Sequence, residues 1–230
     1  MWPPVLISHQ LRSAENLGAL ARVMANFGFS RLILSDPITH DFRGAEKLGV
    51  GAEPVLEKMA VALTLGEALK DVVYAVGTTS RGQLKRFKPL TAEEGVASLH
   101  KHSARGPVAL VLGGEKRGLS DDELALCHDV MVIDTAVDQP SMNVSHAAAV
   151  FCFLCSRVGA AKAEAEPGAP GELLQRLEVK LREAFEKSGF LSPDSPDHVL
   201  KELSRSLVKG ALTRREAEIW LSALTHFSRK

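Results

Sequence analysis

Two short apolar runs near the middle of the chain, each followed by a loop rich in glycine, proline and serine, constrain the fold most. Val108–Leu112 leads into GGEKRG (Gly113–Gly118), and Val130–Ile133 is followed closely by DQPSMNVS (Asp138–Ser145). The second loop leads into an apolar helical segment, AAAVFCFLC. This repeated order of strand, loop and helix is typical of an α/β sheet that binds a ligand at the carboxyl ends of its strands.

The remaining segments extend the alternation. Apolar runs predict strands at 5–8, 31–35 and 72–77, and helical spacing predicts helices at 16–27, 65–70 and 91–102, with one short helix between 39 and 53. Gly28 ends the 16–27 helix, and Ser120 with Glu123 forms a capping box that starts the helix after the glycine loop. Up to about residue 160 the pattern predicts an α/β domain with a mainly parallel sheet and helices on both faces.

The pattern changes at residues 161–172, AKAEAEPGAPGE, which are small and polar and include two prolines and two glycines. We interpret them as a linker between a domain at 1–160 and a helical extension at 173–230. Three helices are expected in the extension, at 173–187, 197–208 and 213–227, the last opening on a capping box of Thr213 and Glu216. Because so short a chain makes a small core, the extension is expected to pack on its parent domain or on a second subunit.

Composition excludes several classes of protein. The chain has 230 residues, 45% hydrophobic and 24% charged, with no formal net charge, as in an ordinary globular protein. No apolar run approaches the ~20 residues that span a bilayer, and the start lacks the basic region of a signal peptide. We therefore expect a cytoplasmic protein without a membrane partner. Zero net charge argues against binding to nucleic acid through overall charge but leaves local basic patches open.

The three cysteines cannot form a disulfide framework. Cys152 and Cys155 are three residues apart on one apolar helix, which favours a buried thiol pair over a redox or zinc site. The other potential ligands show no metal-binding spacing, so no metal is expected.

Three motifs occur in order along the chain. The first, SAENLGALARVMANFGF, holds Asn16, Gly18, Arg22, Phe27 and Gly28. The second, LVLGGEKRGLSDDEL, holds Gly113, Glu115, Gly118 and Leu119. The third, SMNVSHAAAV, holds Ser141, Asn143, Ser145 and Ala147. With these motifs the chain resembles the SpoU/TrmH family of RNA ribose 2′-O-methyltransferases, within the SPOUT superfamily. The tail, with GFL, two prolines and LTRREAEIWLSAL, is similar to the helical extension of the TrmJ type of tRNA methyltransferase.

The resemblance implies a C-terminal trefoil knot in the α/β domain, although knots are rare in proteins generally. It also implies a homodimer whose active site is completed across the interface, S-adenosylmethionine as cofactor, and RNA rather than DNA as partner. The expected substrate is a ribose 2′-hydroxyl in the anticodon loop of tRNA. Two alternatives stay open, namely ribosomal RNA as substrate and a non-catalytic RNA-binding module of the same fold.

The resemblance also assigns residues. The cofactor is expected to contact Thr78, Thr79, Ser80, Leu112, Gly113, Gly114, Ile133, Ser141, Met142 and Asn143. The glycines would let backbone approach a ligand closely. The expected catalytic residues are Arg22, Asn16, Glu115, Ser141 and Asn143. Four of them have a plainer alternative: a helix cap for Asn16 and Ser141, a surface acid for Glu115, and a solvent-facing side chain for Arg22. The resemblance favours Glu115 as a structural or dimer-spanning partner of Arg22. Ser145 could serve the site or packing.

Arg22 is the strongest candidate for chemistry. Its very high pKa makes it a poor base. We therefore expect it to bind the phosphate beside the target ribose with two hydrogen bonds and to hold the hydroxyl in line for transfer.

RNA contacts are expected from basic residues in three places, and binding through them should weaken with salt. They are Arg81, Lys85, Arg86 and Lys88; Lys116 and Arg117; and, in the tail, Arg205, Lys209, Arg214 and Arg215.

The sequence departs from the family pattern after Ile133, where Asp134 replaces the usual proline. That loop could therefore differ in shape, and the acid there could contact cofactor or RNA.

Overall fold

The computed structural model describes residues 2–39, 41–82, 84, 86–159, 166–191 and 197–227. Lys85, one of the expected RNA contacts, lies outside the described residues, as does 161–165 of the expected linker.

The described part of the chain forms one seven-stranded sheet in the order β3-β2-β1-β6-β4-β7-β5, and every pairing in it is parallel. The strands are β1 (Val5–His9), β2 (Leu32–Ser35), β3 (Ala60–Ala62), β4 (Tyr74–Thr79), β5 (Leu90–Thr91), β6 (Val108–Leu112) and β7 (Asp129–Val132). The expected α/β class with a mainly parallel sheet is therefore confirmed. The sequence analysis missed β3 and β5, which are short and lie at the two edges.

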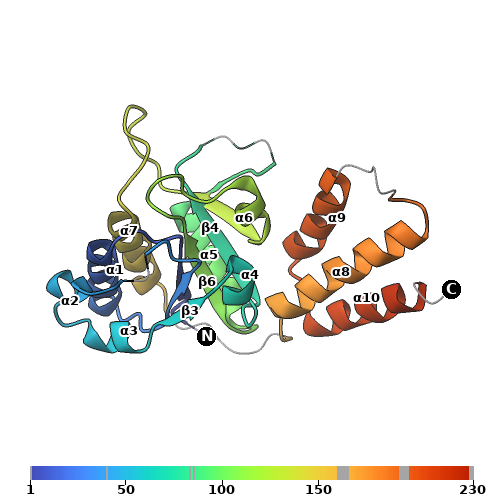
Figure 1. Ribbon diagram of the computed structural model, residues 1–230, viewed down its shortest axis with the longest axis horizontal. Helices are drawn as coiled ribbons and strands as arrows, with labels where there is room; N and C mark the ends of the chain where they lie inside the picture. The colour runs from blue at the N-terminus through green and yellow to red at the C-terminus, as the bar shows by residue number, and fades with distance from the viewer. Residues whose placement is uncertain are drawn as a thin grey trace.

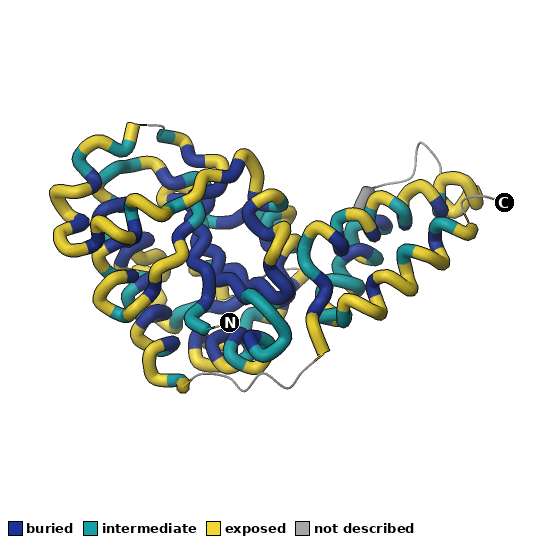
Figure 2. Tube along the Cα trace, turned by 90° about the horizontal axis from the view of Figure 1, so that it is seen from below, coloured by how far each residue is buried: buried dark blue, intermediate teal, exposed yellow. Residues whose placement is uncertain are grey.

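Helices cover both faces of this sheet, and the alternation of side chains along each strand explains how. In β1, Leu6 belongs to one apolar cluster, whereas Val5 and Ile7 belong to another. The first cluster lies under α1 (Ala14–Asn26), α5 (Ala92–Ser103) and α7 (Val144–Ser156), with the short α2 (Ala45–Leu48) and α3 (Glu53–Glu57) beside α1. The second lies under α4 (Leu65–Ala68) and α6 (Asp121–Ala125). Figure 2 shows the resulting buried centre.

Local chemistry sets the helix ends. The capping box of Ser120 and Glu123 is present at α6, and Thr91 with Glu94 forms another at α5. At α1 the side chain of Ser13, not that of Asn16, accepts the capping hydrogen bond, and Gly28 follows the helix with a φ of +75°. The segment 39–53 contains α2 and the start of α3 where one helix was expected.

Three helices, α8 (Gly171–Lys187), α9 (Asp197–Lys209) and α10 (Arg214–Phe227), form a separate group in Figure 1. They share an apolar cluster of their own. The group packs on its parent domain, the first of the two arrangements expected. Gly171 N donates to Val72 O at 2.9 Å, and Gln175 Nε2 donates to Gly66 O in α4 at 2.8 Å. Because α8 begins at Gly171, its first two residues occupy the end of the expected linker.

Candidate active site

A cavity of about 280 Å³ opens where β4, β6 and β7 end. The loops that surround it rise together at the top of Figure 1. Its apolar walls include Leu112, Leu119, Ile133, Met142, Val144 and Phe151. Its polar walls include Thr78, Thr79, Ser80, Glu115, Thr135 and Ser141. Every residue expected to contact the cofactor lines this cavity except Asn143, which lies next to the lining residues Met142 and Val144.

The glycine loop after β6 lies directly against the end of β1. A Cβ added to Gly114 would lie 2.5 Å from the carbonyl oxygen of Gln10, so no side chain fits there without moving backbone. Gln10 itself has a φ of +55°, an uncommon backbone conformation for a residue with a side chain. The close approach allows backbone to form one wall of the cavity, as expected from the glycines.

A chain of hydrogen bonds joins the three motifs beside this cavity. Asn143 Nδ2 donates to Asn16 Oδ1 at 3.0 Å, and Asn16 Nδ2 donates to Glu115 Oε1 at 2.8 Å. The Glu115 carboxylate also accepts from the backbone amide of Arg12. The start of α1, the glycine loop and the start of α7 are therefore fixed relative to one another.

This chain of bonds decides several of the open alternatives. Asn143 caps α7, since its side chain accepts from Ser145 N at 2.9 Å, so the cap interpretation of Ser141 is wrong. Ser141 is instead exposed at the cavity. Ser145 is buried and its hydroxyl donates to Asn143 Oδ1 at 2.8 Å, so it supports the cap. Within one chain the Glu115 carboxylate accepts from Asn16, and a partnership of Glu115 with Arg22 across a dimer stays a prediction.

Arg22 lies on α1 and is exposed. It is not among the residues that line the cavity of its own chain, and it forms no hydrogen bond or ion pair with another described residue. The ring of Phe27, at the end of α1, and the ring of Phe153 from α7 meet edge to face at 6.2 Å, and Phe153 is half exposed.

The basic residues separate into two sets. Arg81, Lys116 and Arg117 line the cavity. Outside it, the structure leaves exposed Arg86, Lys88, Lys209, Arg214 and Arg215. Arg205 differs from all of them, because it is half-buried with its guanidinium carbon 3.6 Å from the centre of the Phe87 ring. Burial lowers the pKa of Arg205.

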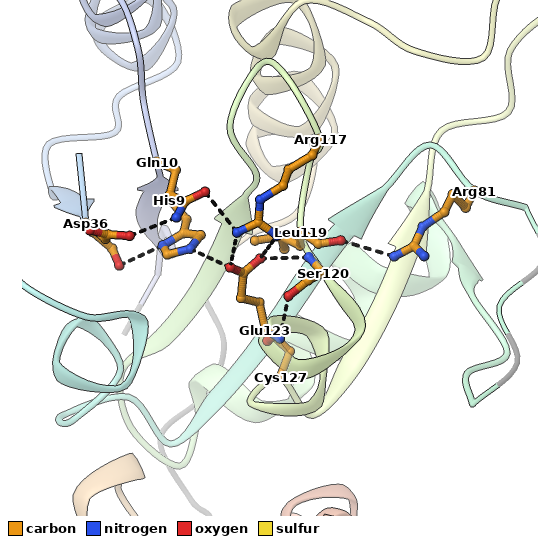
Figure 3. A network of polar contacts seen from close by, with 10 residues as sticks. His9, Gln10, Asp36, Arg81, Arg117, Leu119, Ser120, Glu123 and Cys127 are labelled. Carbon is orange, nitrogen blue, oxygen red and sulfur yellow. Dashed lines mark hydrogen bonds and ion pairs between the residues drawn. The ribbon is translucent and has the colours of Figure 1, made fainter. Parts of the chain in front are cut away.

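A polar network behind the glycine loop was missed by the sequence analysis (Figure 3). Glu123 Oε1 lies 3.0 Å from Nε2 of the buried His9 and 2.7 Å from Nη2 of Arg117. Arg117 Nη2 also donates to Gln10 Oε1 at 2.9 Å. Burial alone would raise the pKa of Glu123, but the Ser120 amide, Arg117 and His9 together lower it to about 2. The only feature of the sequence that indicated this polar network was the capping box of Ser120 and Glu123.

Comparison with known proteins identifies the family. Residues 3–153 match the SpoU rRNA Methylase family, which is well over half of the chain. The chain belongs to the SpoU methylase family.

Relatives of this SpoU methylase extend the similarity to nearly the whole chain. The tRNA (cytidine/uridine-2′-O-)-methyltransferase TrmJ of Cronobacter sakazakii is 29% identical over 213 residues, covering 89% of this chain and 87% of that protein. The uncharacterized tRNA/rRNA methyltransferase LasT of Escherichia coli K12 is 33% identical over 165 residues, covering 71% and 72%. The crystal structure of TrmJ from Z. mobilis ZM4 superposes with a TM-score of 0.86 at 26% identity, covering 97% of this chain and 98% of that one.

The described residues of this SpoU methylase carry neither a membrane-spanning helix nor a metal-binding cluster. None of its described helices is both long and apolar enough to span a membrane. The same part of the chain contains no group of three or more histidine, cysteine or acidic residues able to hold a metal ion.

Proposed function

We propose that this SpoU methylase transfers the methyl group of S-adenosylmethionine to a ribose 2′-hydroxyl of tRNA, in the anticodon loop. The observation that carries the proposal is the hydrogen-bonded chain of Asn143, Asn16 and Glu115, which brings all three motifs to the edge of one cavity. The similarity to TrmJ, which is named for methylation of cytidine and uridine in tRNA, supports tRNA as the substrate.

The cavity fits this cofactor in size and in chemistry. Its volume of about 280 Å³ lies near the lower end of small-molecule sites. Apolar walls of Leu112, Leu119 and Ile133 suit the flat adenine ring, and the hydroxyls of Thr78, Ser80 and Ser141 suit the polar groups of the ligand. The cofactor, when bound, supplies an electrophilic methyl group on a positively charged sulfur.

The chain's own residues would orient the RNA. A 2′-hydroxyl is a weak nucleophile that would have to give up its proton, here to solvent water, on accepting the methyl group, and the cofactor would leave as a neutral thioether. We propose that Arg22 binds the adjacent phosphate with its planar guanidinium and so holds the hydroxyl in line. We also propose four further catalytic residues at this edge of the cavity. They are Asn16, Glu115, Ser141 and Asn143, and hydrogen bonds join Asn16 to Glu115 and to Asn143.

A homodimer is part of this proposal. Arg22 is exposed outside the cavity of its own chain, and the half-exposed Phe153 packs on Phe27 of α1. A second copy bound to the faces of α1 and α7 would cover Phe153 and bring an arginine of one chain to the cavity of the other. This arrangement would explain why a motif residue lies apart from the other motif residues.

The proposed RNA surface comprises exposed basic residues around the cavity and on the extension. They are Arg81, Arg86, Lys88, Lys116, Arg117, Lys209, Arg214 and Arg215. We propose that 173–230 is an RNA-binding extension of the domain at 1–160. Arg205 is left out of this surface because it lies against Phe87.

We also propose the trefoil knot. In the strand order β7 lies beyond β4, near the β5 edge. The helix that follows β7, α7, nevertheless packs on α1, which connects β1 to β2 in the other half of the sheet. The chain must therefore return across the carboxyl ends of the strands, past the loop that leaves β4. Such a return path is what threading of the third motif through a loop requires.

The test is transfer of labelled methyl from S-adenosylmethionine to purified tRNA and, separately, to ribosomal RNA, followed by digestion to nucleosides. We expect 2′-O-methylated cytidine or uridine from tRNA, and none with the Arg22→Ala variant. Label only in ribosomal RNA would move the substrate while keeping the chemistry. A protein that binds RNA but not the cofactor would support the non-catalytic alternative.

A further inference from the structure

The loop that leaves β4 forms part of the cavity wall and is packed from behind. Thr78, Thr79, Ser80 and Arg81 line the cavity, and the chain then continues to β5. Phe87 is a buried side chain in the described part of this loop, and it packs in the second apolar cluster, which also contains Leu119 of the glycine loop and Leu124 of α6. The position of Phe87 therefore fixes where the loop leaves the cavity.

Helix α9 of the extension contacts this loop through Arg205 and the neighbouring helix α6 through Lys201. The guanidinium carbon of Arg205 lies 3.6 Å from the centre of the Phe87 ring, a cation–π geometry. One helical turn earlier, Lys201 Nζ lies 3.0 Å from Asp122 Oδ1 in α6. The neighbouring Asp121 pairs with Arg81 at 2.9 Å, and Arg81 Nη2 donates to Leu119 O at 3.1 Å. Arg81 and Leu119 both line the cavity.

The burial of Arg205 suggests that its contact with Phe87 is the stronger of the two. Lys201 and Asp122 form an exposed ion pair, which contributes little on its own. Arg205 is half-buried, and its Nη1 has no hydrogen-bond partner among the described residues. A guanidinium loses hydration when it is buried, and the ring face is its main described compensation.

We propose that Arg205 is a positioning residue for the cofactor cavity: through Phe87, α9 holds the described part of the loop after β4 and with it the wall formed by Thr78–Arg81. The extension thereby acts on cofactor binding as well as on RNA. This inference rests on the proposed function, because it takes the cavity to be the cofactor site. It gives the extension a second role that its basic surface does not predict.

The experiment compares Arg205→Ala, Arg205→Lys and Phe87→Leu in the full-length chain. Binding of S-adenosylmethionine is measured by calorimetry without RNA, and hydrogen exchange is measured in peptides covering 79–88. We expect Arg205→Ala to weaken cofactor binding about 3- to 10-fold, within the range that cation–π energies allow, and to speed exchange in the loop. Arg205→Lys should restore most of the binding. Phe87→Leu, which keeps an apolar side chain, should act like Arg205→Ala.

Two controls sharpen the result. Lys180→Ala removes a surface ion pair with Glu183 within α8 and should leave cofactor affinity and loop exchange unchanged. In the double variant of Arg205→Ala and Phe87→Leu, the two effects should not add, because each removes the same contact. At saturating cofactor the turnover number should change much less than the KM for the cofactor.

Unchanged affinity and unchanged loop exchange in both Arg205→Ala and Phe87→Leu would overturn the positioning role. A lower melting temperature with unchanged cofactor affinity would also overturn it, because Arg205 would then be purely structural. Absence of cofactor binding in the unaltered chain would instead contradict the proposed function, and loop exchange would still report whether α9 holds the loop.

Discussion

Asn16 connects three distant segments through one carboxamide. It donates to Glu115 in the glycine loop and accepts from Asn143 at the start of α7, two residues that are about 100 or more positions away in sequence. A carboxamide can donate to the carboxylate through its nitrogen and accept from the second amide through its oxygen at the same time. This chemistry, rather than helix capping, explains an asparagine at this position.

Replacement of Asn16 by aspartate is therefore expected to harm the enzyme more than its size suggests. A second carboxylate would face Glu115, and repulsion would separate α1 from the glycine loop. We expect kcat/KM for methyl transfer to fall about 10- to 100-fold, in line with the loss of a hydrogen bond to a charged group. Steady-state assays check this, and the double variant with Glu115→Gln, which removes the repulsion, should recover part of the activity. Activity within twofold of the unaltered chain would contradict the bridging role.

Glu123 gives a prediction about pH. Its pKa is about 2 in the folded chain against an ordinary 4.5, so its carboxylate stabilises the fold above pH 4.5 and loses that effect as the pH falls towards 2. At about 1.4 kcal/mol per pH unit the contribution is at most about 3 kcal/mol at neutral pH, because solvent screens the partly exposed carboxylate and reduces it. Urea unfolding of Glu123→Gln should show this deficit at pH 7 and a shrinking one from pH 5 to pH 3. The exposed Glu218→Gln on α10 should change stability by less than about 0.5 kcal/mol at each pH.

Sequence motifs located the cavity residues well but not their partners. The glycines and hydroxyls around the cavity follow strand ends, and a strand end can be recognised from sequence. The end of β1 (His9 and Gln10), the glycine loop (Arg117) and α6 (Glu123) are three different segments, and no local pattern records that they meet. Arg22 illustrates the same limit, because in the proposed homodimer its place relative to a cavity depends on how two chains assemble.

Among the helices, α1 shows why the first motif contains a glycine. A Cβ added to Gly18 would lie 2.0 Å from the carbonyl oxygen of Ala45, so α1 and α2 approach each other through backbone. Glycine normally weakens a helix by about 1 kcal/mol relative to alanine. Close packing with α2 offsets that cost here.

Gly18→Ala should therefore destabilise the fold although alanine favours helix. We expect a loss of about 1–3 kcal/mol, the usual cost of overpacking, with α2 displaced. Urea denaturation measures the loss. Ala25→Gly, at an exposed position of the same helix, should cost about 1 kcal/mol through helix propensity alone. A Gly18→Ala protein more stable than the unaltered chain would show that α2 yields without cost.

The strands that were missed show what local patterns lack. β3 and β5 contain three and two residues and lie at the sheet edges, where pairing with a neighbour rather than intrinsic preference makes them strands. The expected helices were found because their apolar periodicity and capping residues are local. Element type could thus be predicted, whereas strand order could not.

For the molecule as a whole, the three cysteines report unfolding. Cys127, Cys152 and Cys155 are fully buried, and burial raises the pKa of Cys127 and of Cys155 to about 12 and also raises that of Cys152. We expect almost no reaction of the folded chain with a thiol-specific chromogenic reagent at pH 8, and three thiols per chain in denaturant. Rapid labelling of one thiol in the folded chain would show that its segment opens locally.

The sheet order also determines when this fold can form during synthesis. The inner strand β1 pairs with β6, and the apolar face of α1 is covered by α7. Because β6 and α7 come later in the chain, they are synthesised well after β1 and α1. At ordinary rates of translation, roughly 5–20 s pass between β1 and β6 leaving the peptidyl transferase centre. In that interval the nascent chain exposes an open strand edge and an uncovered helix, a surface suited to chaperones. Chains stalled on the ribosome before β6 should therefore be protease-sensitive, and chains stalled well after α7 should be resistant.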